Sequence, residues 1–121
     1  MSSGHAEGLF RRGEFLRLIE TATPEADANP KGGDAPTRLR LAEALALTGN
    51  VSRAIEIASP YSGGRREPAV RAHAEYILAI AAWRSGNVTS AAKLFGLAVR
   101  DALESKNTRC VAWTYLHTFR F

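Results

Sequence analysis

The segment Ser85-Gly86-Asn87-Val88-Thr89-Ser90-Ala91 decides the fold, because the chain contains nearly the same phrase at an earlier position. Thr48-Gly49-Asn50-Val51-Ser52-Arg53-Ala54 follows the same pattern, and the two glycines are 37 residues apart. A weaker copy, Arg12-Gly13-Glu14-Phe15-Leu16-Arg17-Leu18, places its glycine another 36 residues upstream. Periods of this length are typical of arrays of helical pairs.

Each of the three glycines lies between two helical patterns. After Gly86, apolar residues recur at steps of three and four positions, which is one face of a helix: Val88, Ala91, Ala92, Phe95, Ala98, Val99 and Ala102. We expect Gly86 to end the first helix in a left-handed conformation, and the Asn87 side chain to cap the second. Gly49 and Asn50 are predicted to do the same one repeat earlier. The glycines are therefore interpreted as turns between antiparallel helices, since their spacing matches no phosphate-binding loop.

Outward from these turns, the sequence predicts an all-α chain that folds as one domain over residues 1–121. Alanine and leucine dominate the composition, and both favour helix. The predicted helices span 3–12, 14–23, 35–48, 51–58, 68–85, 88–105 and 108–121. They group into units at 3–23, 35–58 and 68–105 and a partial unit at 108–121, with proline- and glycine-rich loops at 24–34 and 59–67.

These residues resemble the tetratricopeptide repeat, in which small and bulky side chains occupy fixed positions around the turn glycine. The third unit matches through Leu78, Ala79, Gly86, Ala91, Phe95 and Ala98, and departs at Ala82. The second unit matches through Leu41, Ala42, Leu45, Gly49 and Ala54, and departs at Ala58 and Tyr61. The first is partial: Ala6, Leu9 and Gly13 match, whereas Leu18, Ala22 and Glu25 fit less well. The resemblance implies antiparallel helix-turn-helix repeats in a short right-handed superhelix; the alternative is an irregular helical bundle.

In that family, the first helix of each pair lines a concave groove that holds a peptide or a helix of a partner. By offset from the turn glycines, the resemblance implies these groove residues: Phe10, Arg11, Leu39, Glu43, Leu47, His73, Tyr76, Ile80, Trp83 and Arg84. Aromatic and arginine side chains often carry the energy of such interfaces. The alternative is that Tyr76 and Trp83 belong to the core, because their helix is apolar on every side. Members of the family that bind chaperone tails clamp a carboxylate with lysine and asparagine, and this pattern is missing here.

We therefore expect a protein-interaction module or scaffold, which could be the regulatory part of a larger protein. The alternative is a nucleic-acid-associated regulator that uses scattered arginines: Arg11, Arg12, Arg38, Arg40, Arg65, Arg66 and Arg71. The net charge of +4 is compatible with that alternative but modest, and no run of five like charges occurs. No nucleic-acid-binding motif is recognisable, so protein binding is the favoured hypothesis.

The sequence predicts no enzyme, no metal site and no cofactor. His5, His73 and His117 lack partners at metal-ligand spacing. Cys110 precedes His117 by two helical turns, roughly 10 Å, which is too far for a thiolate–imidazole pair. We also recognise no paired carboxylates in an apolar setting.

We also expect that the protein is cytoplasmic and that its partner is another protein. The longest apolar run, 76–83, is too short to cross a membrane, and the single Cys110 cannot form an intrachain disulfide. Residues 108–121 resemble the first helix of a fourth pair. We expect either that the chain is a piece of a longer array or that it self-associates through an aromatic surface: Trp113, Tyr115, Leu116 and Phe119.

Overall fold

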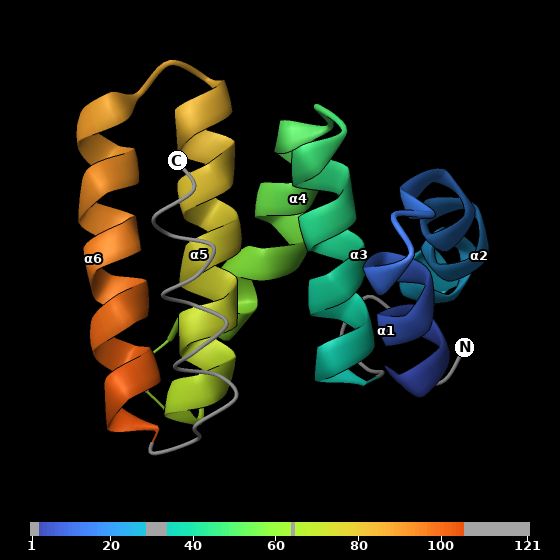
Figure 1. Cartoon of the computed structure of the whole chain (residues 1–121), viewed down its shortest axis with the longest axis horizontal. Coiled ribbons are helices and arrows are strands. Elements are labelled where there is room, and N and C mark those ends of the chain that lie inside the picture. The colour runs from blue at the N-terminus through green and yellow to red at the C-terminus, as the bar shows by residue number, and fades with distance from the viewer. Residues whose placement is uncertain (1–2, 29–33, 64, 106–121) are drawn as a thin grey trace.

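The computed structural model describes residues 3–28, 34–63 and 65–105, and every regular element within these ranges is helical (Figure 1). The elements are α1 (Ser3–Arg11), α2 (Phe15–Ala28), α3 (Ala35–Leu47), α4 (Val51–Ala58), the 3₁₀ turn η1 (Ser59–Tyr61), α5 (Pro68–Arg84) and α6 (Val88–Glu104). The predicted all-α class is confirmed. The helix predicted over 108–121, together with Cys110 and His117, lies outside the described residues.

The three glycine corners are built alike. Gly13, Gly49 and Gly86 have φ angles of 75°, 96° and 83°, the left-handed region that a side chain disfavours. At each corner the residue after the glycine donates its backbone N–H to the carbonyl five residues earlier. The nitrogen–oxygen distances are 2.9 Å for Glu14 to Leu9, 2.8 Å for Asn50 to Leu45 and 2.9 Å for Asn87 to Ala82. This satisfies carbonyls that the end of a helix would otherwise leave unpaired. The predicted turns are confirmed.

The two asparagines after the glycines differ in what they cap. The Asn87 side chain accepts a hydrogen bond from the Ser90 backbone N–H at 3.2 Å, so the predicted cap of α6 is confirmed. The Asn50 side chain makes no such bond to α4, and its amide instead donates to the Thr48 hydroxyl at 3.5 Å. The predicted cap at Asn50 is therefore wrong, because its side-chain oxygen accepts no hydrogen bond from the first turn of α4.

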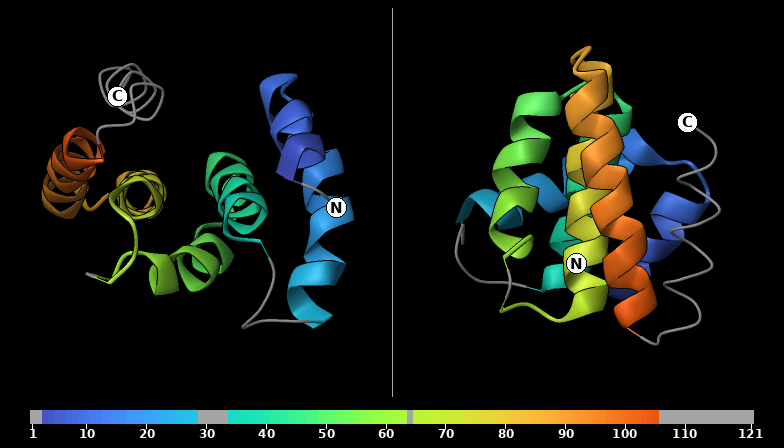
Figure 2. Two further views of the ribbon diagram at one scale, coloured as in Figure 1. Left: turned by 90° about the horizontal axis from the view of Figure 1, so that it is seen from below. Right: turned by 90° about the vertical axis from the view of Figure 1, so that its left-hand side faces the viewer.

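Helices α3 and α4, and helices α5 and α6, form antiparallel hairpins, whereas α2 crosses α1 and is seen nearly end-on in Figure 1. α1 packs on α2, α3 on α4, and α5 on α6; between hairpins, α3 packs on α1 and α2, and α5 packs on α3 and α4. Figure 1 shows α3 and α5 running side by side in the same direction, and Figure 2 shows α4 on one side of that pair. The right-handed superhelix implied by the resemblance stays a prediction.

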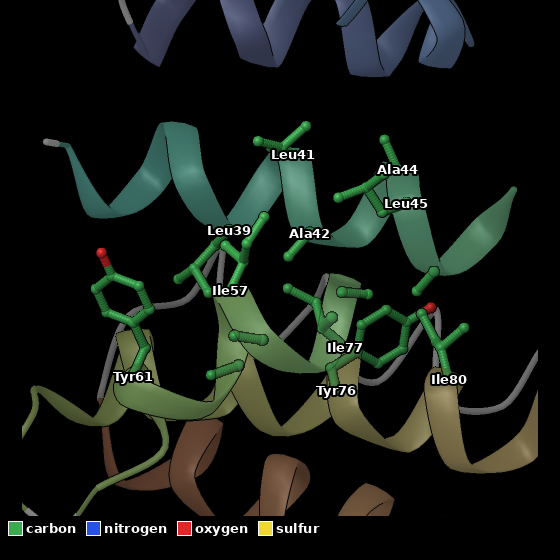
Figure 3. Packing of buried hydrophobic residues seen from close by; sticks show 14 of the residues in the cluster. Leu39, Leu41, Ala42, Ala44, Leu45, Ile57, Tyr61, Tyr76, Ile77 and Ile80 are labelled. Carbon is green, nitrogen blue, oxygen red and sulfur yellow. The ribbon is translucent and has the colours of Figure 1, made fainter. Parts of the chain in front are cut away.

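Helices α3 and α5 are buried on more than one side, which explains why neither shows a clear polar face. Figure 3 shows Leu39 and Ala42 of α3 directed toward α4 and α5, while Leu41 points the opposite way, toward α1 and α2. Fully buried alanines run through both helices and α6, and include Ala42, Ala44, Ala46, Ala74, Ala79 and Ala98. Small side chains let neighbouring helices approach closely, and Tyr76 and Phe95 fill the remaining space between α5 and α6, with ring centroids 5.8 Å apart.

Two predicted loops are shorter than expected. Helix α2 continues through Pro24 to Ala28, because Ala22 and Ala26 are buried as α2 packs on α3, and this packing outweighs the hydrogen bond that Pro24 cannot make. The loop predicted at 59–67 begins with η1, which carries Tyr61 into the core. No helix in the described ranges is long and apolar enough to cross a membrane.

Candidate functional site

The predicted groove residues divide into a buried set and an exposed set. Leu39, Glu43, Tyr76 and Ile80 are each at most 2% exposed, so they cannot contact a partner in this packing. This corrects the expectation that they line an open groove: the alanines of α3 and α5 bring the helices so close that these side chains fill the space between them. The four residues are part of the core.

His73 is half-buried in the first half of α5, and the other predicted residues lie at the corner ends of their helices. Arg11, Trp83 and Arg84 are exposed, and Phe10 and Leu47 are half-buried against the core. Trp83 is 43% exposed, which is unusual for so large an apolar side chain. Arg11, Leu47 and Arg84 each stand two positions before a corner glycine, in α1, α3 and α5 respectively. We call these three residues and Trp83 the corner edge.

Behind the corner edge, a polar network joins the first helices of all three units. Arg40 of α3 donates two hydrogen bonds to the Glu7 carboxylate of α1, from Nε at 2.5 Å and from a terminal nitrogen at 3.2 Å. Its other terminal nitrogen donates to Glu43 Oε1 at 2.8 Å, and His73 Nε2 of α5 lies 2.7 Å from the same oxygen. The Arg40 guanidinium also lies 4.8 Å from the centre of the Phe10 ring. We call Glu7, Arg40, Glu43 and His73 the inter-repeat network.

The inter-repeat network is charge-compensated. Burial raises the pKa of Glu7, but the hydrogen bonds and the positive charge of Arg40 and Arg11 outweigh burial, so the pKa of Glu7 is lowered. The Glu43 side chain is 1% exposed; it accepts a hydrogen bond from Arg40 of its own helix and lies 2.7 Å from His73 Nε2 of α5. A buried carboxylate without such partners would be strongly destabilising. The network links α1 to α3 and α3 to α5.

Glu75 of α5 and Asp101 of α6 form a second buried cluster, which the sequence reasoning missed. The two carboxyl groups are hydrogen-bonded to each other and are 6% and 2% exposed. Burial, with the hydrogen bond and the charge of Asp101, raises the pKa of Glu75 to about 8. The pKa of Asp101 is lowered: burial by itself would raise this pKa, but the hydrogen bonds from Glu75 and Arg71 to the carboxylate outweigh burial. At neutral pH a protonated Glu75 therefore donates to an ionised Asp101.

Arg71 completes the carboxyl cluster. Its guanidinium lies 3.3 Å from an Asp101 oxygen and 3.3 Å from a Glu104 oxygen. No paired carboxylates in an apolar setting were expected from the sequence, and the burial of Glu75 and Asp101 beside each other corrects this expectation. The sequence did contain one indication of this pair. Glu75 lies 11 residues before Gly86 and Asp101 lies 15 residues after it, so an antiparallel hairpin brings the two residues to similar positions along the helix axes.

The central carboxylates of both clusters are buried. Glu43, Glu75 and Asp101 are almost fully buried, and the described residues contain no group of three side chains placed to hold a metal ion. Several arginines considered for nucleic-acid binding are engaged with carboxylates of the chain itself: Arg11 with Glu7, Arg12 with Glu14, Arg40 with Glu7 and Glu43, and Arg71 with Asp101. The aromatic surface predicted from Trp113, Tyr115, Leu116 and Phe119 lies outside the described residues. No protein-family model, curated protein or solved structure matches this chain.

Proposed function

We propose that this chain is a protein-interaction module whose stacked hairpins hold a peptide or helix of a partner protein along the corner edge. The observation that carries the proposal is the recurrence of one position in three units. Arg11, Leu47 and Arg84 occupy that position, and none of them is buried. Trp83, beside Arg84, adds an exposed aromatic side chain. Arginine and aromatic residues are the side chains that most often anchor protein interfaces.

The packing order supports a tetratricopeptide-like arrangement as part of this proposal. The second helix of one unit packs on the first helix of the next, as repeat arrays require. Packed helices lie roughly 8–10 Å apart, so a partner crossing α1, α3 and α5 spans roughly 20 Å, about six extended residues. The proposed surface lies at the ends of the helices, because the inter-repeat network and the buried side chains fill the space between α1, α3 and α5. The module acts without a cofactor, and in the cytoplasm, as the single Cys110 suggests.

Site-specific photo-crosslinking tests this proposal. A photoreactive phenylalanine analogue replaces Leu47 in one protein and Leu103, an exposed residue near the far end of α6, in a matched control. Each protein is irradiated in an extract of the native source, and cross-linked products are identified by mass spectrometry. We expect a discrete partner from the Leu47 probe only, and its loss when Arg11→Glu and Arg84→Glu are added. The same products from both probes, or no product from either, would contradict the proposal.

A further inference from the structure

The corner between α5 and α6 joins exposed apolar surface to positive charge. Trp83 is 43% exposed just before Gly86, and Val88 is 58% exposed just after it. Arg84, next to Trp83 in the sequence, is exposed, and Lys93 is exposed about one and a half turns into α6. Within the described ranges neither Arg84 nor Lys93 has an ion-pair partner, in contrast to the paired arginines of the two buried clusters. We call Trp83, Arg84 and Val88 the α5–α6 corner surface.

Charge is distributed unevenly along this hairpin. Residues 76–100 contain no Asp and no Glu, whereas they contain Arg84, Lys93 and Arg100. The four carboxylates of the hairpin lie toward its other end and are Glu67, Glu75, Asp101 and Glu104. Eleven residues of helix separate Glu75 from Gly86, which is roughly 16 Å and exceeds the Debye length at physiological salt. The hairpin's own acidic residues therefore leave the positive charge of the corner uncompensated.

We infer that the α5–α6 corner surface binds an acidic segment of a partner protein, with an apolar side chain of that segment packed on Trp83 and Val88. This inference rests on the proposed function and adds the chemistry of the partner. Acidic residues beside the apolar side chain meet Arg84, and Lys93 adds positive charge to the same half of the hairpin. The complementarity of charge steers association and fixes orientation, while the apolar contact supplies most of the affinity.

A peptide fits this surface better than a nucleic acid does. Proteins that bind single strands stack successive bases on several aromatic side chains and contact many phosphates. The corner has one exposed aromatic residue, and the nearest other aromatic residues described in this hairpin, Tyr76 and Phe95, are buried against each other. Arg84 provides a single cationic contact on this surface, far fewer than a nucleic-acid footprint uses.

Peptide selection on the purified full chain tests the inference. A phage-displayed library of random 16-residue peptides is selected at low and at physiological salt, and the strongest binder is synthesised with a fluorescent label. We expect enriched peptides to carry several Asp or Glu around a Leu, Ile, Phe or Trp, and binding to weaken as salt rises. Enrichment of neutral or basic peptides overturns this inference and leaves the proposed function standing. Failure to enrich any peptide overturns both.

Variants locate the binding site of the labelled peptide. Trp83→Ala should weaken binding about 30-fold, the loss typical of an interface anchor, and Arg84→Glu about tenfold. The matched control is Leu103→Ala, which removes an equally exposed apolar residue from the other end of α6 and should change binding less than twofold. Circular dichroism of each variant verifies the fold. Equal binding by the wild type and Trp83→Ala overturns the inference, as does competition by a 16-nucleotide single-stranded DNA at lower concentration than the unlabelled peptide.

Discussion

The buried carboxyl pair predicts an unusual dependence of stability on pH, and Glu75→Gln isolates it. Glutamine has the shape of a protonated glutamic acid and can donate the same hydrogen bond to Asp101, but it cannot ionise. The folded chain retains the Glu75 proton up to about pH 8, whereas the unfolded chain releases it near the ordinary pKa of 4.5. Between these values the folded state binds more protons, so stability must fall as pH rises.

The magnitude follows from the size of this pH window. A difference of 3.5 pH units between 4.5 and about 8 corresponds to at most about 5 kcal/mol, lost at about 1.4 kcal/mol per pH unit. The contribution of Glu75 is fully present below pH 4.5 and is lost as pH approaches 8. Asp101, with a lowered pKa, has the opposite sign: its contribution is lost only as pH falls below its ordinary value of 3.8, outside this window.

Urea denaturation followed by circular dichroism at pH 5, 6, 7 and 8 provides the measurement. We expect the unfolding free energy of the wild type to decline relative to that of Glu75→Gln by about 1.4 kcal/mol for each pH unit. Groups that titrate in both proteins cancel in this difference. The control Glu20→Gln removes an exposed carboxylate from α2 and should give a profile parallel to that of the wild type. Parallel profiles for wild type and Glu75→Gln would refute the assignment of a protonated Glu75.

Two further perturbations test the network and the corners. Arg40→Met leaves Glu7 and Glu43 without their shared partner and should cost about 3–5 kcal/mol of unfolding free energy. Arg53→Met, at more exposed ion pairs with Asp27 and Glu56, should cost less than about 1 kcal/mol. Similar losses in urea titrations would contradict the role of the inter-repeat network. Gly86→Ala should lower the unfolding free energy by about 1–2 kcal/mol, because the φ angle of Gly86 is 83°. Gly96→Ala in α6 should raise the melting temperature, because an added Cβ there meets no atom within 4 Å and alanine favours helix. Stabilisation by Gly86→Ala would show that the corner is not left-handed.

Local signals in the sequence predicted the corners and most helix boundaries, because the turn conformation depends on the glycine itself and on the hydrogen bonds around it. The continuation of α2 through Pro24 could not be predicted this way, since it depends on the burial of Ala22 and Ala26 against α3. Propensity alone favours a break at proline, and tertiary packing decides otherwise.

The site was harder to predict than the fold, because each cluster joins residues from different helices. Glu7 and Arg40 are 33 residues apart, and so are Arg40 and His73. This separation is one helical turn less than the repeat period, so opposite charges at that spacing would have suggested contacts between neighbouring first helices. The groove prediction used only offsets from the glycines. Offsets identify the helix position but not how closely the alanines of α3 and α5 bring the helices together, so Leu39, Glu43, Tyr76 and Ile80 were placed on an open surface.

Hydrogen–deuterium exchange with and without the selected acidic peptide tests the central claim most directly. The account predicts slower amide exchange on peptide binding at the last turns of α3 and α5 and the first turn of α6, around Leu47, Trp83 and Val88, with no change near Leu103. Protection confined to the far end of α6, or to the outer face of α2, would contradict the claim that the corner edge holds the partner.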